Sequence, residues 1–599
     1  MAKTVNDFSI TVATVNGSGS QSANNILMRA LFRSGVPVAG KNLFPSNIAG
    51  LPTWFTIRVS EKGFVGRRPQ SEVVVAMNKE TLFQDFEYLK PGGLFIYNSN
   101  LRFAEVELPP NVNLLPVPFN DLAKDVSDSI QLKKLLVNMI YVGVLAELLE
   151  VSDEVMSGTI EHQFRGKESV YSINKKAVEA GRSYVRENLK DYAFPLRIEP
   201  KKLTQNKILI EGNTASALGL VYAGCSFVAW YPITPSSSLV ESFESQCRNL
   251  RTNKKGEKLF SVIQSEDELS AISMVAGAGW AGARAMTATS GPGVSLMGET
   301  IGLMYFAEIP GVIWDVQRMG PSTGLPTRTS QGDILSAVHC SHGDTRHPVL
   351  FPANPKECFE FALLAFDLAE RAQTPVFVLT DLDLGMNTWM SDRFDFPDKP
   401  FDRGKVLKKE DLEKRGEFAR YADVDGDGIP YRTLPGTDHD LAAYFTRGTG
   451  HTPEAKYSER ADNYQDLLNR LDRKWETMKT LIPSPIVHCH ERAKTGLIFF
   501  GTTDLIIPEL LQLLGEGIYS TLRLKAYPFH RDVQTFVEKH DRILVIEQNQ
   551  HGQMTGLLRS DFPRWADKIF VHTSCDGLPL CPEILAHELK SFAGGNSGH

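Results

Sequence analysis

The stretch Gln264–Gly293, QSEDELSAISMVAGAGWAGARAMTATSGPG, decides the fold of the central part of this chain. It predicts an apolar helix that begins near Glu268, then a short strand, then a glycine turn. Ser265 and Glu268 have the spacing of a capping box, in which the glutamate bonds back to the start of its own helix. The alternative is that a carboxylate at the head of this helix faces a bound cofactor ring.

Strands and helices alternate on both sides of this stretch. The predicted strands are Phe227–Tyr231, Ala283–Ala288, Gly311–Val316 and Pro375–Thr380. The predicted helices are Ser237–Arg248, Asp267–Trp280, Val294–Phe306 and Lys356–Arg371. Short apolar strands that alternate with helices of about a dozen residues indicate a doubly wound parallel sheet, covered on both faces.

The 599 residues are enough for three or four domains at roughly 100–200 residues each. We expect an α/β domain over 1–189, a charged linker with two prolines over 190–206, and the central domain over 207–386. A charged connector with few strand patterns, 387–493, ends in the amphipathic helix Asn463–Leu481. A last α/β domain spans 494–599, with strands at Thr495–Phe500, Leu522–Tyr527 and Arg542–Glu547.

Composition excludes several classes of protein. The formal net charge is -7 with no large basic block, which argues against nucleic acid as a partner. The longest nearly apolar run, Leu135–Leu149, falls short of the ~20 residues of a membrane span and predicts a core helix. The N-terminus has no signal-peptide core, so we expect a cytoplasmic protein. Seven cysteines without a C-x-x-C pair predict reduced thiols and no iron–sulfur cluster in this chain.

Two features of the opening stretch resemble thiamine diphosphate (ThDP) enzymes. From Glu268 the sequence follows the pattern E-x-x-A-x-x-x-x-x-G, and Thr289–Gly293, TSGPG, is similar to the glycine turn after the next strand. The resemblance implies that Glu268 is the catalytic glutamate that hydrogen-bonds the aminopyrimidine ring, with Ser290 and Gly291 beside the cofactor. Burial in an apolar cleft would favour the protonated carboxyl group that this role needs.

Two further motifs resemble the 2-oxoacid:ferredoxin oxidoreductases. They are Tyr231–Ser237, YPITPSS, and Asp315–Gly324, DVQRMGPSTG. In that family the threonine of the first motif and the arginine of the second bind the substrate carboxylate, which implies Thr234 and Arg318 here. Both residues follow a predicted parallel strand, at the edge where open α/β sheets bind ligands. An arginine suits bidentate capture of a carboxylate. Tyr231, Pro232 and Ile233 are expected to contact the cofactor.

The resemblance covers nearly the whole chain. The turn Gly17–Gln21 looks like the family's gamma module, and Val545–Gln553, VIEQNQHGQ, looks like the C-terminal, transketolase-C-like domain of the alpha subunit. The order is similar to that of the large subunit of bacterial 2-oxoglutarate:ferredoxin oxidoreductases. The expected fold is therefore multi-domain α/β, with a gamma-type domain, a ThDP pyrimidine-binding doubly wound domain and a transketolase-C-like domain.

The resemblance implies conversion of 2-oxoglutarate to succinyl-CoA and CO2, with coenzyme A as co-substrate and electrons passed to ferredoxin. The α/β regions contain no convincing G-D-G motif for Mg²⁺, and the chain lacks the cysteines of a cluster. In this family the beta subunit holds the ThDP diphosphate with its Mg²⁺ and a [4Fe–4S] cluster. We therefore expect an alpha–beta heterotetramer that is active only with the beta subunit.

Three alternatives remain open. The substrate could be pyruvate or a branched-chain 2-oxoacid. The chain could be a different ThDP enzyme, such as a carboligase, which would need diphosphate and Mg²⁺ ligands of its own. It could also be a non-catalytic assembly subunit that only resembles the alpha module.

One acidic loop has the spacing of a metal site. Asp423–Gly428, DVDGDG, matches the first half of a calcium loop, and its carboxylates Asp423, Asp425 and Asp427 predict a structural Ca²⁺ or Mg²⁺. The alternative is an ordinary acidic turn, because Leu434 stands where the last calcium ligand is expected and Pro430 interrupts the loop.

Overall fold

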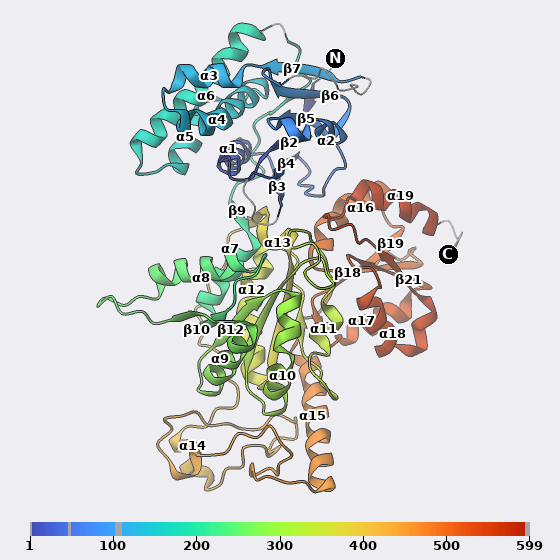
Figure 1. Cartoon of the computed structure of the whole chain (residues 1–599). Helices are drawn as coiled ribbons and strands as arrows, with labels where there is room; N and C mark the ends of the chain where they lie inside the picture. The colour runs from blue at the N-terminus through green and yellow to red at the C-terminus, as the bar shows by residue number, and fades with distance from the viewer. Residues whose placement is uncertain (1–2, 46–49, 102–110, 191, 594–599) are drawn as a thin grey trace.

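The computed structural model describes residues 3–45, 50–101, 111–190 and 192–593. Figure 1 shows an N-terminal unit, a central unit beneath it, a C-terminal unit beside the central one, and an excursion at the far end of the central unit. Each of the three units is built on one main β-sheet with helices packed against it.

The N-terminal unit contains an eight-stranded sheet in the order β7-β6-β5-β2-β4-β3-β16-β9. Its strands are β2 (Asp7–Val15), β3 (Val38–Leu43), β4 (Pro52–Ser60), β5 (Ser71–Ala76), β6 (Leu89–Asn98), β7 (Asn113–Val117), β9 (Lys207–Glu211) and β16 (Thr388–Asp392). A short parallel pair, β1 (Thr4–Val5) and β8 (Leu196–Arg197), lies beside it.

Helices cover this sheet unequally. Four helices share one apolar core with the sheet: α1 (Ser20–Arg33), α4 (Ile130–Leu148), α5 (Asp153–Gln163) and α6 (Glu168–Asn188). The helix α3 (Phe119–Val126) joins the same core, and α2 (Leu82–Glu87) packs against the opposite face. The predicted core helix at Leu135–Leu149 is therefore confirmed as part of α4. No single helix of the described residues is long and apolar enough to cross a membrane; α3 and α4 together meet the length and composition, with a 119° bend between them.

Two strands cross the domain boundaries that the sequence predicts. The strands β9 and β16 stand immediately before and after the central unit, yet they pair antiparallel with each other, Ile210 opposite Trp389, and complete the N-terminal sheet. The boundaries at 207 and 386 thus do not coincide with the edges of the sheets. The two strands tie the central unit to the N-terminal one at two points of the chain.

The central unit contains the predicted doubly wound sheet, in the order β11-β10-β12-β13-β15-β14-β20. All pairs are parallel except that of β14 with β20, a strand that the C-terminal part of the chain contributes. The bounds are β10 (Phe227–Trp230), β11 (Ser261–Gln264), β12 (Ala285–Thr289), β13 (Gly311–Gln317), β14 (Val349–Leu350), β15 (Pro375–Asp381) and β20 (Ala526–Tyr527). The sequence pattern did not predict β11, β14 or the role of β20.

Helices cover both faces of the central sheet. On one face lie α9 (Glu268–Trp280), α10 (Gly291–Phe306) and α11 (Ile334–Val338). On the other lie α7 (Gly212–Tyr222), α8 (Ser237–Leu250) and α12 (Pro355–Ala372). Alternate residues of β13 explain this: Ile313 packs under α9 and α10, while Val312 and Trp314 pack against the opposite layer. The short helix α13 (Leu382–Met386) continues from the end of β15.

The C-terminal unit contains a five-stranded sheet in the order β17-β19-β18-β21-β22. Its strands are β17 (Ile486–His488), β18 (Thr495–Phe500), β19 (Tyr519–Leu524), β21 (Arg542–Glu547) and β22 (Ile569–Thr573). The helices α16 (Ile507–Leu514) and α19 (Pro582–Ala593) cover one face. The helices α17 (Arg531–Lys539) and α18 (Gln553–Asp561) pack between the other face and the central unit.

The excursion that follows β16 is mostly irregular, as its charged sequence predicts. It contains α14 (Lys409–Arg415) and returns through α15 (Ala461–Leu481). A buried ion cluster fastens it: Arg470 donates two hydrogen bonds to Glu308, at 3.0 and 2.7 Å, and Lys474 donates one at 2.8 Å. Burial alone would raise the pKa of Glu308, but the two cations outweigh it and hold the value at about 2.

Candidate active site

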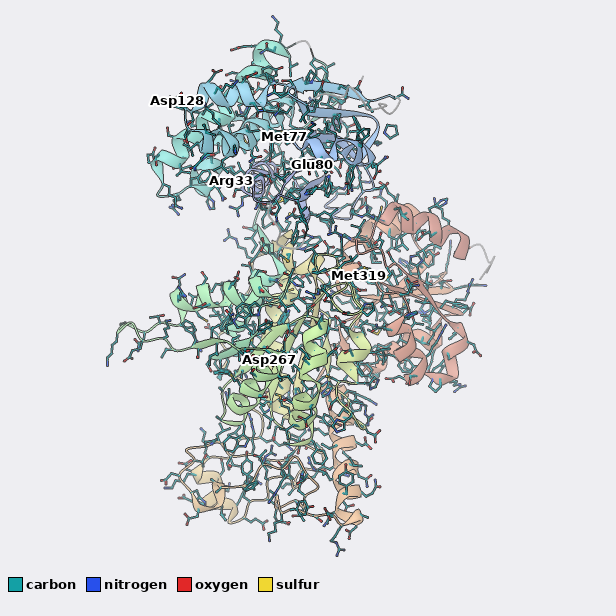
Figure 2. All side chains as sticks on the ribbon, viewed as in Figure 1. Arg33, Met77, Glu80, Asp128, Asp267 and Met319 are labelled. Atoms are coloured by element: carbon teal, nitrogen blue, oxygen red, sulfur yellow. The ribbon has the colours of Figure 1, made fainter. Side chains whose placement is uncertain are left out.

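The residues that the sequence analysis singled out gather at the carboxyl edge of the central sheet. Thr234 follows β10, Glu268 follows β11, and Arg318 follows β13. Arg318 Nη1 donates a 2.8 Å hydrogen bond to the backbone carbonyl of Thr234. Figure 2 marks the sequence neighbours Asp267 and Met319 within this central unit. The residues that follow β10 and β13 therefore lie side by side, as the sequence predicts.

The capping-box reading of Glu268 is wrong. The residue that caps α9 is Asp267, whose carboxylate accepts the backbone N–H of Ser270 at 2.7 Å. Ser265 points elsewhere, because its hydroxyl donates to the carbonyl oxygens of Trp230 and Asp267. Glu268 is 5% exposed, and within the described part of the chain its carboxylate has no hydrogen-bond partner. Its carboxyl group is thus free to meet a ligand.

The glycine turn after β12 makes room for this glutamate. A Cβ atom on Gly293 would lie 2.0 Å from Thr289 Oγ1 and 2.8 Å from Glu268 Cγ. Only a residue without a side chain allows Glu268 to lie against the first turn of α10. Ser290 caps that helix with its backbone, while its own hydroxyl is buried without a hydrogen-bond partner in the described residues. Gly291 is the first residue of the helix.

Arg318 is a buried cation with unused hydrogen-bonding capacity. Its Nε atom has no partner among the described residues, and the residue is 8% exposed. Burial lowers the pKa of Arg318, and the carboxylates of Asp333 and Glu268 oppose that shift. Tyr231 and Pro232, at the mouth of the same edge, are exposed. This edge therefore offers a guanidinium, a threonine and a carboxyl group next to accessible surface.

Two carboxyl groups at this edge were missed by the sequence analysis. Asp315 is fully buried on β13, and neither of its carboxyl oxygens has a partner in the described residues. Burial, and then the neighbouring Asp333, raise the pKa of Asp315 well above its usual range. Burial also raises the pKa of Asp333 to about 6, although Arg318 opposes the shift. An aspartate inside the otherwise apolar strand GVIWDVQ was the signal available in the sequence.

The C-terminal unit holds the loop that joins Arg318 to Asp333. The backbone N–H of Gln331 donates to the carbonyl of Gln548 at 2.7 Å, and the N–H of Gln548 donates back to Gln331 Oε1 at 3.1 Å. The amide of Asn549 donates to the Gln331 carbonyl at 3.0 Å. The motif at Val545–Gln553 therefore supports the site from behind.

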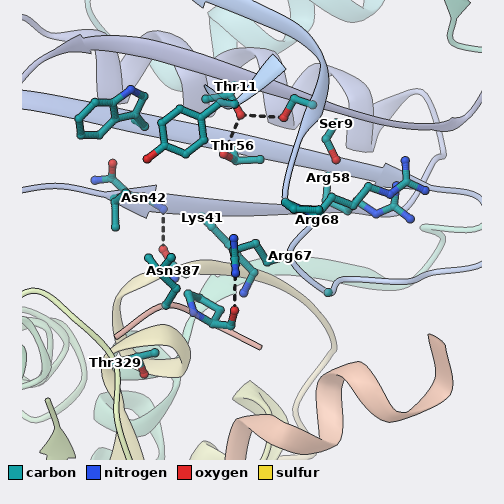
Figure 3. A pocket seen from close by; sticks show the side chains of 18 of the residues that line it. Ser9, Thr11, Lys41, Asn42, Thr56, Arg58, Arg67, Arg68, Thr329 and Asn387 are labelled. Carbon is teal, nitrogen blue, oxygen red and sulfur yellow. Dashed lines mark hydrogen bonds between the residues drawn. The ribbon is translucent and has the colours of Figure 1, made fainter. Parts of the chain in front are cut away.

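A cleft opens where the three units meet, lined by β3 and β4 of the N-terminal sheet, by Thr327 and Thr329 of the central unit and by residues 577–579. Figure 3 shows Lys41, Arg58, Arg67 and Arg68 along its walls. Lys41 donates to the Asp383 carboxylate at 2.7 and 3.0 Å. Arg67 donates to a backbone carbonyl, that of Pro579, at 3.0 Å. Arg58 and Arg68 are paired with the carboxylates of Asp7, Glu72 and Glu509, so among the described residues Arg67 is the one of these four cations without a carboxylate partner. We call this the basic cleft.

The acidic loop of the excursion is held by cations of the chain itself. The ammonium of Lys405 lies 2.7 Å from both Asp425 and Asp427, and Arg473 lies 3.0 Å from Asp423. Among the residues that the structure describes, no group of three metal-ligating side chains could hold an ion. The metal prediction for Asp423, Asp425 and Asp427 is therefore not supported, because Lys405 takes the place between two of its proposed ligands.

These features define a class of protein. A glutamate without a partner, a buried serine hydroxyl without one, and glycines that leave space beside it fit the aminopyrimidine ring of ThDP. These residues lie at the N-terminal ends of α9 and α10, and both ends are at the carboxyl edge of a doubly wound parallel sheet. The central unit has the architecture of the pyrimidine-binding half of a ThDP-dependent enzyme.

Comparison with known proteins gives the family. Residues 218–442 match the family model "Pyruvate flavodoxin/ferredoxin oxidoreductase, thiamine diP-bdg", and residues 9–184 match "Pyruvate ferredoxin/flavodoxin oxidoreductase". The chain is 31% identical to the alpha subunit of 2-oxoacid:ferredoxin oxidoreductase 2 from Aeropyrum pernix, over 98% of this chain and 97% of that one. It therefore belongs to the 2-oxoacid:ferredoxin oxidoreductase family, as an alpha-type subunit with a fused gamma-type domain.

Two further similarities bear on the reaction. The chain is 34% identical to 2-oxoglutarate synthase subunit KorA of Methanothermobacter thermautotrophicus, over 58% of this chain and 88% of that one. A solved 2-oxoglutarate:ferredoxin oxidoreductase from Magnetococcus marinus, with 2-oxoglutarate, coenzyme A and succinyl-CoA bound, matches with a TM-score of 0.87. That match has 29% identity and covers 98% of this chain and all of the other.

Proposed function

We propose that this chain is the carboxylate-binding and cofactor-activating subunit of an enzyme that converts 2-oxoglutarate, coenzyme A and oxidised ferredoxin to succinyl-CoA, CO2 and reduced ferredoxin. The observation that carries the proposal is the convergence of Glu268, Thr234 and Arg318 at one sheet edge. The choice of 2-oxoglutarate rests on the similarity to the M. marinus enzyme and to the KorA subunit.

Each of the three residues has a distinct task. The free N–H groups of Arg318 and the hydroxyl of Thr234 bind the carboxylate next to the ketone and fix its direction. Glu268, which is only 5% exposed, forms the hydrogen bond to the aminopyrimidine ring. When bound, ThDP supplies the nucleophilic carbon and the electron sink. Ser290 and Gly291, with the exposed Tyr231 and Pro232 and the half-buried Ile233, form the wall against which the cofactor lies.

The outer face of α9 and α10 supports a second subunit as partner. Apart from Glu299, its exposed side chains are apolar or small, which is unusual for surface helices: Leu269, Met274, Trp280, Leu296 and Leu303 are 37 to 49% exposed. Gly277 opens onto free space on the same face. We propose that the beta subunit covers this face and brings the diphosphate site, Mg²⁺ and [4Fe–4S] cluster, and that two such pairs form the heterotetramer. The cytoplasmic location stays a prediction.

Coenzyme A suits the basic cleft where the three units meet. Its phosphate groups need cations, and in the described residues Arg67 has no carboxylate partner, so its charge is available. The loop from Arg318 to Asp333 runs between the cleft and the carboxylate site, and Thr327 and Thr329 of this loop line the cleft. A long, thin co-substrate bound there could reach the site with its thiol end.

The test is turnover of the co-expressed complex with 2-oxoglutarate, pyruvate and 2-oxoisovalerate, each with coenzyme A and an electron acceptor. We expect kcat/KM to be highest for 2-oxoglutarate. Glu268→Gln should abolish turnover of an assembled complex, while the exposed neighbour Glu266→Gln should keep it. A preference for another 2-oxoacid would correct the substrate. Turnover by this chain alone would favour a different ThDP enzyme, and full activity of the Glu268 variant would favour a non-catalytic subunit.

A further inference from the structure

One edge of the central unit carries an arm that the proposed reaction does not use. The arm, Arg251–Leu259, joins the end of α8 to the start of β11 and stands out from the central unit in Figure 1. It leads directly into β11, and Glu268 begins the helix that follows this strand. The strand β11 is the last of its sheet, and no described strand pairs with its outer side. This edge of the central sheet is therefore open.

The arm holds its own shape. The backbone N–H of Leu259 donates to the carbonyl of Arg251 at 2.8 Å, and that of Asn253 donates to the carbonyl of Glu257 at 3.0 Å. The side-chain oxygen of Asn253 accepts the N–H of Glu257 at 3.0 Å. The guanidinium of Arg251 donates to the carbonyl of Val221 in α7 at 3.4 Å and anchors the base of the arm. A projection that is already ordered loses little conformational entropy when it binds a partner.

The arm combines a cationic tip with an apolar base. It contains four cations and one carboxylate, in a chain whose formal net charge is -7. Its lysines, Lys254, Lys255 and Lys258, are exposed, and no ion pair between described residues includes them. At the base of the arm, Leu250 and Leu259 are 52 and 56% exposed. Exposed apolar side chains rimmed by charges mark sites of protein–protein contact.

The rest of this edge has the opposite charge. The sequence has no lysine or arginine from Ile208 to Cys247, which includes most of α8, or from Phe260 to Ala283, which includes β11 and α9. Glu241, in the first turns of α8, is exposed, and no ion pair between described residues includes it. Because α8 runs back from the carboxyl edge of the sheet to the amino edge, Glu241 and the arm lie towards opposite ends of this helix. The open edge is therefore acidic at one end and basic at the other.

Such an edge is complementary to itself. When two copies meet edge to edge across a twofold axis, the arm of each copy lies beside the acidic end of the other. We propose that the arm binds the α8 edge of a second copy of this chain and so joins the two alpha–beta pairs of the heterotetramer. The inference rests on the proposed function, which supplies the pairs. In this contact Lys254 and Lys255 of one copy face Glu241 of the other, and Leu250 and Leu259 are covered.

The test is the dissociation of the co-expressed complex into single alpha–beta pairs, followed by sedimentation velocity over a dilution series. Lys254→Glu with Lys255→Glu should raise the dissociation constant by about 10- to 100-fold, because a twofold contact contains each changed charge twice. Added salt should also dissociate the wild type, since exposed charges are screened. The matched control is Lys175→Glu with Lys176→Glu, an exposed pair on α6 without an ion pair in the described residues, and it should leave the constant unchanged.

A charge exchange identifies the surface that receives the arm. Glu241→Lys alone should weaken the association of the pairs, as the arm variant does. Combined with Lys254→Glu and Lys255→Glu, it should bring the dissociation constant back towards the wild-type value, because the attraction returns with both signs reversed. A thermal melt of each variant checks that the chain stays folded.

Several results would overturn the inference: a wild-type complex that never exceeds one pair, an arm variant that dissociates like the wild type, or a charge exchange that adds to the loss. Separation of this chain from its beta subunit by the arm variant would place the arm within a pair instead. An intact tetramer with a raised KM for ferredoxin would assign the arm to the electron acceptor, against the proposal. Sedimentation does not depend on turnover, so absence of 2-oxoacid turnover would overturn only the proposed function.

Discussion

The contact between Gly293 and Glu268 gives the sharpest test of how this site is built. A methyl group on Gly293 would lie 2.0 Å from Thr289 Oγ1, 2.8 Å from Glu268 Cγ and 3.0 Å from Glu268 Oε1. Ordinary contact begins at 3.4 Å, so Gly293→Ala must displace both the threonine hydroxyl, by about 1.4 Å, and the glutamate, by about 0.6 Å. The backbone of α10 has little freedom to absorb this, because Val294 and Met297 are fully buried.

Two opposing effects set how much Gly293→Ala changes the free energy of unfolding. Overpacking costs about 1–3 kcal/mol, and replacing glycine by alanine inside a helix returns roughly 0.5–1 kcal/mol. The free energy of unfolding should therefore fall by about 0–2.5 kcal/mol. Activity should change more, because misplacing a catalytic group by about 1 Å can cost on the order of 100-fold in rate. We expect kcat of the complex to fall by about 10- to 100-fold.

A matched control separates packing from the general effect of an alanine. Gly556 also lies within a helix, α18, and no atom stands within 4 Å of the position that a methyl group on it would take. Gly556→Ala should raise thermal stability slightly and leave kcat unchanged. The assay is steady-state turnover with 2-oxoglutarate, beside a thermal melt of each variant. If Gly293→Ala kept wild-type kcat in a folded complex, Glu268 would not be held by this contact and the proposed geometry of the site would be wrong.

Four further outcomes are expected. Arg318→Lys loses the forked donor, and KM for the 2-oxoacid should rise about 10- to 100-fold in steady-state kinetics while KM for coenzyme A stays unchanged. Arg67→Ala should raise KM for coenzyme A about tenfold and leave KM for the 2-oxoacid unchanged. Glu308→Gln leaves two buried cations without their partner and should lower the free energy of unfolding by about 3–5 kcal/mol in a denaturant titration. The pKa of Glu308 in the folded protein is depressed to about 2, so its contribution to the free energy of unfolding is present above the pKa of the unfolded chain and is lost as pH falls towards 2. In melts between pH 5 and 2, the variant should therefore lose less stability than the wild type. Calcium or a chelator should leave the melting temperature unchanged, since Lys405 already pairs with the loop at Asp423–Asp427.

The sequence predicted the layers of the central unit because its strands are short apolar runs and its helices have one apolar side. It also predicted that the ends of β10 and β13 lie together, and the structure joins Thr234 to Arg318 there. The roles of these residues stay predictions. What the pattern could not decide was which residue caps α9: Ser265 and Asp267 both have suitable side chains, and Ser265 is engaged by the carbonyl of Trp230, which is 35 positions away in the chain.

Long-range pairing explains the other differences. The strands β9 and β16 pair across most of the central unit, and β20 joins the central sheet from the C-terminal part of the chain. Each has only two to five residues, so its own sequence does not single out one sheet edge, and only the assembled fold determines its place.

The same sheet edge explains why three units are needed for one site. At the end of β15 the chain enters α13, where Asp383 receives Lys41 from the N-terminal sheet, and Asn387 accepts the backbone N–H of Asn42 at 2.8 Å. Asp381, at the end of β15, bonds to Thr502 of the C-terminal unit. These buried polar contacts fix the walls of the basic cleft relative to the strand ends that carry the candidate site. A change of distance between cleft and site must therefore break a buried ion pair or hydrogen bond, so the fused N-terminal unit acts as a positioned wall of the site rather than as an appended domain.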